Sequence, residues 1–226
     1  MRSFGFGLGG SRPIPIPLFG SGGGDGYVDP VPGWLFAYKD FTESALTPIN
    51  SPSTVTGLGR PDTQAASFNG VDQRYSSSDL GLTAVGTGAF TILARMKTSV
   101  TSQQVILATG TGSSSDQFRF RMNNTGQLQF RTSNNNKSSS GANLANGVWR
   151  HVAIRSEGSG SAGAIFIDGS KSTNVTMQTY NFTGTGFLQV GASNEVQPFN
   201  GELDDIFFYD RALTDSEILA KADDKV

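Results

Sequence analysis

Alternating apolar and polar positions mark the chain from about residue 34 onward. Residues 90–97 read FTILARMK, in which one set of alternate positions is apolar and the other carries Arg95 and Lys97. A period of two predicts a β-strand, here one that is half-buried. The same reasoning predicts further strands at residues 118–122, 128–130, 149–154, 165–167, 187–191 and 203–209.

Turn signals separate several of these strands. The segment NNTG at 123–126 lies between two alternating runs and predicts a hairpin turn, and Asp168-Gly169 predicts a second tight turn. Short strands at such regular spacing are typical of an antiparallel sandwich or jelly roll. The sequence therefore predicts an all-β fold of two packed antiparallel sheets.

One helix is predicted, near the C-terminus. Thr214 with Glu217 three residues later forms a capping-box pattern, and Ile218 and Leu219 follow it. The predicted domain is thus a two-sheet antiparallel jelly-roll sandwich with one short C-terminal helix.

The composition changes near residue 33. The first 33 residues of the 226-residue chain hold ten of its 29 glycines and five of its nine prolines. We therefore predict an extended Gly/Pro-rich arm over residues 1–33 and a sandwich domain over residues 34–226. A solvated tail rarely carries many apolar side chains, so we interpret the arm as a docking segment that orders on a partner or a neighbouring subunit, with a disordered tail as the alternative. The predicted docking residues are Phe4, Phe6, Leu8, Ile14, Ile16, Leu18 and Phe19.

Charge and composition exclude several classes of function. With 17 basic and 19 acidic residues, the chain lacks the basic excess of a protein that binds nucleic acid through phosphate contacts. It has no cysteine and a single histidine, which excludes a disulfide scaffold, a cysteine-ligated metal site and a cysteine nucleophile. No apolar run approaches the ~20 residues of a membrane span, and the N-terminus lacks the apolar core of a secretory signal. We expect neither membrane insertion nor export by the general secretory route.

His151 is the only histidine in the sequence and therefore a candidate catalytic residue. A Ser-His-Asp arrangement would need a serine in an elbow such as G-x-S-x-G, and the similar small residues at 158–163 lie in a predicted loop. We interpret His151 as a structural strand residue beside Trp149.

Several segments, taken in order, resemble the laminin-G-like and pentraxin-like jelly rolls of the concanavalin A-like lectin/glucanase superfamily. The resemblance runs from about residue 34 to residue 222 and implies the same two-sheet sandwich with a short C-terminal helix. The segments that carry it are FNGVD at 68–72, AFTI at 89–92, NGVWRHVA at 146–153, IFIDG at 165–169 and FNGELDDI at 199–206, followed by YDRALT at 209–214.

The carboxylates of the 199–206 segment do not complete the catalytic set of related enzymes. Glu202 and Asp204 lie on one strand face at i, i+2 and match the first two members of the E-x-D-x-x-E pattern of sandwich glucanases, but Phe207 stands at the last position. We therefore expect no enzymatic activity and no catalytic residues. Asp204 and Asp205 are expected to be strand-edge residues that hold nearby turns.

Calcium is the metal that suits this composition, because it takes oxygen ligands from Asp, Asn, Glu, Gln and the backbone. Pentraxin-like members hold calcium with a pair before one strand and an acidic-amide cluster after a later one. The resemblance implies Asp116, Gln117, Asn194 and Glu195 as calcium ligands, although Gln117 replaces an asparagine and the later cluster is less acidic. Calcium is therefore an option and no cofactor is certain. Leu93 and Val152 stand where the pentraxin cysteines would align, which agrees with folding in a reducing cytoplasm.

The family resemblance implies binding of glycans or proteins. Aromatic side chains on loops commonly form sugar platforms, and Tyr75 and Phe199 are the predicted glycan-binding residues, while Tyr180 could equally belong to the core. A lectin-like sandwich without an export signal, behind an apolar arm, also resembles accessory virion proteins of tailed bacteriophages. We thus predict a virion surface protein, a capsid decoration or tail fibre component, made in the host cytoplasm. Its predicted partners are other virion proteins, further copies of itself and a host surface glycan.

Two alternatives remain open. A bacterial extracellular carbohydrate-binding module, exported by a non-classical route, predicts stabilisation by calcium or sugar. A glycan-cleaving enzyme would need a pair of carboxylates that the sequence does not supply.

Overall fold

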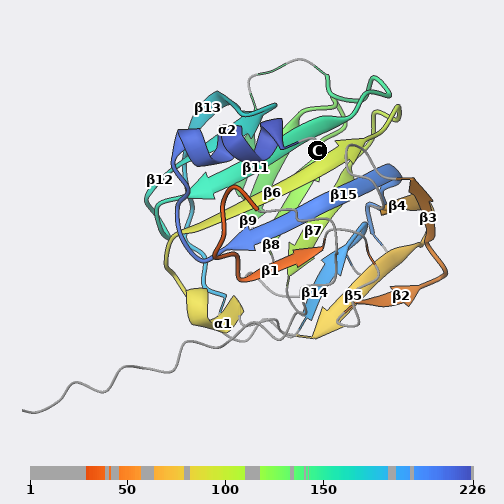
Figure 1. Cartoon of the computed structure of the whole chain (residues 1–226), viewed down its shortest axis with the longest axis horizontal. Coiled ribbons are helices and arrows are strands. Elements are labelled where there is room, and N and C mark those ends of the chain that lie inside the picture. Colours follow the sequence, from red (N-terminus) through yellow and green to blue (C-terminus); the bar gives the residue numbers. More distant parts are fainter. Residues whose placement is uncertain are drawn as a thin grey trace, which may run out of the picture.

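Two antiparallel sheets stack face to face in the computed structural model of this protein (Figure 1). The structure describes residues 29–38, 41, 46–56, 64–78, 82–109, 118–132, 135–139, 141, 143–182, 187–193 and 196–224. Eight strands form one sheet, in the spatial order β13 (Ser170–Thr176), β12 (Ala162–Ile167), β11 (Arg150–Ser156), β6 (Phe90–Lys97), β15 (Asn200–Tyr209), β4 (Gln64–Asn69) and β3 (Ser53–Thr56), with β1 (Phe36–Tyr38) also paired to β15.

The second sheet has seven strands. Their order is β10 (Asn135–Ser138), β9 (Leu128–Thr132), β8 (Phe118–Met122), β7 (Gln104–Thr109), β14 (Phe187–Val190), β5 (Arg74–Ser78) and β2 (Thr47–Ile49). The helices of the described chain are α1 (Leu82–Val85) and α2 (Asp215–Asp223). The all-β sandwich with a short C-terminal helix is confirmed, and the strands predicted around residues 90, 120, 130, 150, 165, 188 and 205 all form.

The main core lies between the two sheets. Phenylalanines from both layers meet there, and the ring centroids of Phe90 on β6 and Phe118 on β8 are 6.0 Å apart. On β8 and β9 the residues Phe118, Phe120 and Phe130 point into this core, so the side chains between them point out of the sandwich. Aromatic pairs of this kind add to the stabilisation from buried area.

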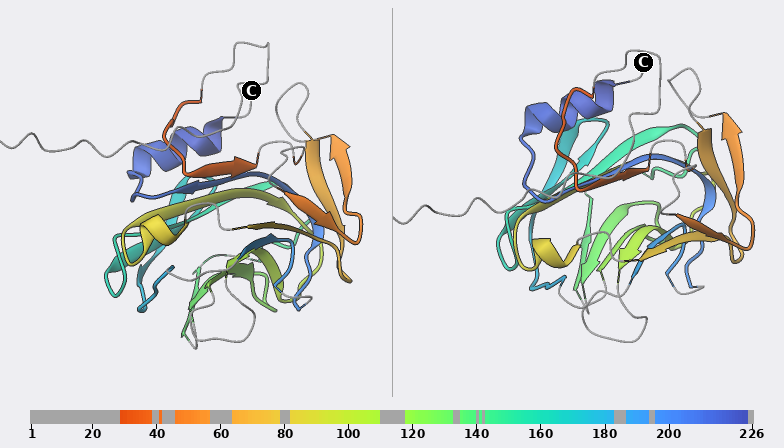
Figure 2. Two further views of the ribbon diagram at one scale, coloured as in Figure 1. Left: turned by 90° about the horizontal axis from the view of Figure 1, so that it is seen from below. Right: turned by 60° about the horizontal axis from the view of Figure 1, so that its bottom comes forward.

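A second, smaller core lies on the other face of the eight-stranded sheet. Figure 2 shows α2 resting on that outer face, where Leu93 of β6 and Phe207 of β15 pack beneath Ile218 of the helix. As a result β6 is buried on both faces, and the prediction of a half-buried strand at 90–97 was wrong. The sequence pattern could not show this second face, because its cover comes from residues more than 100 positions away.

The local signals for turns and caps are confirmed. Asp168 and Gly169 both have positive φ, 49° and 76°, as the tight turn between β12 and β13 requires. The Thr214 side chain accepts a hydrogen bond from the Glu217 backbone, and the Glu217 side chain accepts one from the Thr214 backbone. This capping box begins α2.

Residues 29–33 lie on the sandwich rather than apart from it. Val31 is buried, and its carbonyl accepts a 2.7 Å hydrogen bond from the Tyr209 hydroxyl. The Asp29 carboxylate lies 3.1 Å from Lys221 of α2. The last residues of the predicted arm therefore pack on the domain, while its apolar docking residues, from Phe4 to Phe19, lie outside the described residues. Within the described chain, no helix is long and apolar enough to cross a membrane.

Candidate functional site

The predicted calcium ligands lie outside the part of the chain that the structure describes. These are Asp116, Gln117, Asn194 and Glu195. The flanking strands are described, and β8 begins beside the C-terminal end of β7, with Phe118 opposite Thr109. In contrast β14 runs toward the N-terminal end of β7, where Gly191 N–H bonds to the Ile106 carbonyl. The described strands that flank these residues thus begin or end at opposite ends of β7, and the calcium site stays a prediction.

The aromatic residues predicted as sugar platforms lie in the main core. Tyr75 of β5 is 4% exposed and Phe199, just before β15, is fully buried. Both rings make edge contacts with Phe68. The expectation that they present a ring to solvent was therefore wrong for this structure, because both side chains fill the space between the sheets. Tyr180 is also buried and donates its hydroxyl hydrogen to the Gly88 carbonyl.

The acidic side chains of β15 are in ion pairs or buried within the sheet. Glu202 lies 3.2 Å from Lys97, and Asp205 lies 3.1 Å from the Arg95 Nε atom. Asp204 and Asp205 are both buried in a β-bulge of an interior strand, so their predicted place at a strand edge was wrong. Phe207, at the position of the missing glutamate, packs under α2.

The outer face of the seven-stranded sheet gathers the arginines of β8 and β9. Arg119 and Arg121 alternate with the core phenylalanines of β8, and Arg131 of β9 lies directly opposite Arg119 in the ladder. Gln129 lies opposite Arg121. We call Arg119, Arg121, Gln129 and Arg131 the arginine face. Figure 2 shows that α2 covers the other sheet, so among the described elements no second layer covers this one.

Arg121 is held at the centre of a glutamine network. Its Nε and Nη2 donate to the Gln129 side-chain oxygen at 3.1 and 2.9 Å, and its Nη1 donates to Gln103 and Gln197 at 3.1 and 2.9 Å. Gln197 also donates to Gln103 at 2.7 Å. These side-chain oxygens fix the orientation of the guanidinium.

Crowding of like charges is the main electrostatic feature of this face. Burial and the neighbouring positive charges of Arg131 and Arg119 lower the pKa of Arg121 to about 10. Burial and the charge of Arg131 also lower the pKa of Arg119. Like charges directly opposite each other destabilise a sheet, and their positive potential favours a bound anion. The arginine face is suited to holding a carboxylate or sulfate, which guanidinium groups bind through paired hydrogen bonds.

Sequence reasoning missed this site although its pattern was visible. The run FRFRM at 118–122 alternates phenylalanine and arginine, and QFRT at 129–132 repeats the pattern in part. What the sequence could not give was the register that sets Arg119 opposite Arg131. That register depends on the length of the turn at 123–126.

Comparisons with known proteins agree with this architecture. The model of the concanavalin A-like lectin/glucanases superfamily matches residues 69–219, more than half of the chain. Domain 4 of an extracellular GH43 arabinanase from Geobacillus stearothermophilus, solved with arabinotriose, has a TM-score of 0.66 at 18% identity, covering 84% of this chain and 98% of that one. Among curated protein sequences, none matches the chain.

Two further solved structures share the fold. The CBM40 domain of the Ruminococcus gnavus IT-sialidase, bound to α2,3-sialyllactose, has a TM-score of 0.57 at 17% identity, with 84% of this chain and 100% of that chain covered. A heptameric pentraxin from Limulus polyphemus has a TM-score of 0.54 at 18% identity, with 69% and 80% covered. At these identities the likeness is one of fold.

Proposed function

Because the chain belongs to the concanavalin A-like lectin/glucanases superfamily, we propose that it is a non-catalytic module that binds an anionic glycan on the arginine face. The observation that carries this proposal is the pairing of Arg119 directly opposite Arg131. Two guanidinium groups directly opposite each other concentrate positive potential on one face of the sheet, which favours an anionic ligand there.

The two roles on this face differ. Arg121 is 2% exposed and bound by three glutamines, so it positions its neighbours. Arg119 and Arg131 are partly exposed and supply the contacts to the ligand. The ligand class is a sugar that carries a carboxylate or a sulfate. Buried carboxylates on β15 and Phe207 beside them support a binding role rather than glycan cleavage.

The test compares charged and neutral glycans on the full chain. We expect sialyllactose or dextran sulfate to bind, and lactose or dextran not to bind at this face, by isothermal titration calorimetry. Arg131→Gln and Arg119→Gln should each weaken anion binding about tenfold or more, since a charge-assisted hydrogen bond contributes about 1.5–3 kcal/mol. Higher salt should weaken binding as well.

Lys171→Gln is the matched control, because it removes one positive charge from β13 on the other sheet, where Lys171 pairs with Asp215. Equal binding of charged and neutral glycans, or unchanged anion affinity in both arginine variants, would contradict the proposal. Release of reducing ends from the glycans would contradict its non-catalytic part.

We infer further that the arm of residues 1–33 attaches this module to a larger assembly, in the leading hypothesis a phage particle. This rests on the sequence argument: an apolar Gly/Pro-rich arm precedes a lectin-like domain. Several copies on one particle would raise the avidity of weak glycan contacts. A bacterial extracellular module is the alternative, and the truncation experiment in the Discussion separates the two.

A further inference from the structure

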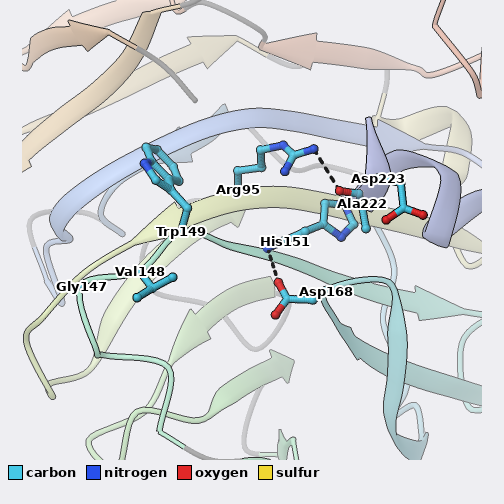
Figure 3. A pocket seen from close by; sticks show the side chains of 8 residues that line it. All are labelled: Arg95, Gly147, Val148, Trp149, His151, Asp168, Ala222 and Asp223. Atoms are coloured by element: carbon cyan, nitrogen blue, oxygen red, sulfur yellow. Dashed lines mark hydrogen bonds between the residues drawn. The ribbon is translucent and has the colours of Figure 1, made fainter. Parts of the chain in front are cut away.

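A pocket lies on the opposite layer of the molecule from the arginine face. It occupies about 490 Å³ between the start of β11, the turn after β12 and the C-terminal end of α2 (Figure 3). This volume falls within the range of about 300–1,000 Å³ that is common for small-molecule sites. Its lining residues are Arg95, Gly147, Val148, Trp149, His151, Asp168, Ala222 and Asp223.

Arg95 makes one wall of this pocket rigid. Its Nη2 atom donates to the carbonyls of Lys221, Ala222 and Asp224 at 3.2, 3.3 and 2.7 Å, and its Nε atom pairs with Asp205. A cation at the C-terminal end of α2 also suits the helix dipole. The end of the helix is therefore fixed to β6, and Arg95 defines this wall of the pocket.

His151 leaves a polar atom of this pocket without a partner. The residue is 5% exposed, and among the described residues its Nδ1 atom has no hydrogen-bond partner. Burial, together with the positive charges of Arg95 and Lys221, lowers the pKa of the imidazole to about 3, so the ring is neutral. The neutral ring therefore lines the pocket without adding a charge to it.

The mouth of the pocket combines an apolar wall with two carboxylates. Trp149 is half-buried and lines the pocket, so its indole offers a flat apolar surface to a ring, while the exposed Val148 points away from the indole (Figure 3). Asp168 accepts a hydrogen bond from the His151 backbone at 3.0 Å and one from Arg150 at 2.7 Å, with its side chain 45% exposed. Asp223 is exposed at the end of α2.

We propose that this pocket is a second ligand site, which binds one neutral sugar unit against the Trp149 indole with its hydroxyls on the carboxylates of Asp168 and Asp223. Charged side chains around the pocket are paired within the protein, Asp168 with Arg150 and Arg95 with Asp205, so they favour a neutral ligand over an ion. A neutral ring with several hydroxyls suits this lining, because each hydroxyl can donate to a carboxylate oxygen.

The test uses the two tryptophans and the single histidine of the chain as reporters. In a Trp34→Phe chain, Trp149 is the sole indole, and its fluorescence is followed during titration with methyl galactoside, methyl glucoside and arabinotriose. In the natural chain, the imidazole protons of His151 are followed by NMR with the same sugars. We expect at least one sugar to change both signals with the same affinity.

Matched variants separate this site from the arginine face. Trp149→Ala should lower neutral-sugar affinity tenfold or more and leave anion binding unchanged. Arg131→Gln should lower anion affinity and leave neutral-sugar affinity unchanged. The two proposals can therefore fail independently of each other. The proposal is overturned if none of the three sugars moves either signal.

Discussion

At the scale of single residues, the charged groups beneath α2 set the protonation of their neighbours. Lys221 is buried, and burial lowers its pKa although Asp29 and Asp205 counter that effect. Its ammonium group lies 3.5 Å from the centre of the Phe207 ring, a cation–π contact that offsets part of the cost of burial. Burial of the His151 ring, reinforced by the positive charges of Arg95 and Lys221, keeps it neutral by lowering its pKa. Lys221, Arg95 and His151 thus coexist in one buried layer because the imidazole is neutral and the two cations are paired with carboxylates.

His151 should make stability depend on pH in a defined window. The unfolded chain takes up a proton on His151 below about pH 6.5, whereas the folded chain takes it up only near pH 3, so acidification favours the unfolded state. Between pH 7.5 and pH 5.5 we expect a loss of about 1.4 kcal/mol in the free energy of unfolding. Urea denaturation at both pH values measures it.

The matched control for this effect is His151→Asn, in which the loss over this window should be much smaller whatever the overall stability. Hydrogen bonding to Arg211 lowers the pKa of Glu217 from 4.5 to about 2, so its contribution is lost only at more acidic pH. The same pH slope in the natural chain and the variant would contradict the assignment.

At the scale of elements, local signals were predictable and pairings between distant segments were not. The Asp168-Gly169 turn and the Thr214–Glu217 capping box are confirmed because neighbouring residues determine them. Strand β7 was missed because residues 104–109 are buried throughout and lack a period of two, and its ladder with β8 contains a bulge. The pocket was equally hidden, because it forms where the end of α2 meets a turn more than 50 residues away in the chain.

The capping box offers a test of α2 as a separate element. Thr214→Ala removes the side-chain oxygen that accepts from the Glu217 backbone, and we expect a loss of about 1 kcal/mol in the free energy of unfolding. Ser216→Ala is the comparison variant, because the exposed Ser216 hydroxyl lies 3.0 Å from the Thr214 hydroxyl but is not the oxygen that accepts from the Glu217 backbone. Urea midpoints of the two variants decide the matter, and equal midpoints would show that the cap contributes nothing.

At the scale of the whole molecule, the chain before β1 connects the predicted arm to the layer that contains α2. Asp29 and Val31 contact Lys221 and Tyr209, so the segment 29–33 closes the second core from the side. Residues 29–33 therefore contribute to the stability of the domain, and the arm that can be removed without cost ends near residue 28. Truncations on either side of this segment should behave differently.

Residues 29–226 should unfold at the same urea concentration as the full chain, while residues 34–226 should lose about 3 kcal/mol or more. Removal of Asp29 takes away the nearest carboxylate of the buried Lys221 and leaves the more distant Asp224, 3.8 Å away, and Asp205, while removal of Val31 exposes apolar surface. Asp29→Asn in the full chain isolates the ion-pair part of this loss.

Light scattering on the same chains tests the arm itself. If residues 1–28 dock on a neighbouring subunit, the full chain forms an assembly and residues 29–226 are monomeric with unchanged stability, since the apolar docking residues are lost while the sandwich stays closed. If the full chain and residues 29–226 are both monomers, the arm does not mediate self-association. The bacterial extracellular module is then the favoured interpretation. Comparing chains that begin at residue 29 matters here, because a chain that begins at residue 34 would confound lost docking with a weakened domain.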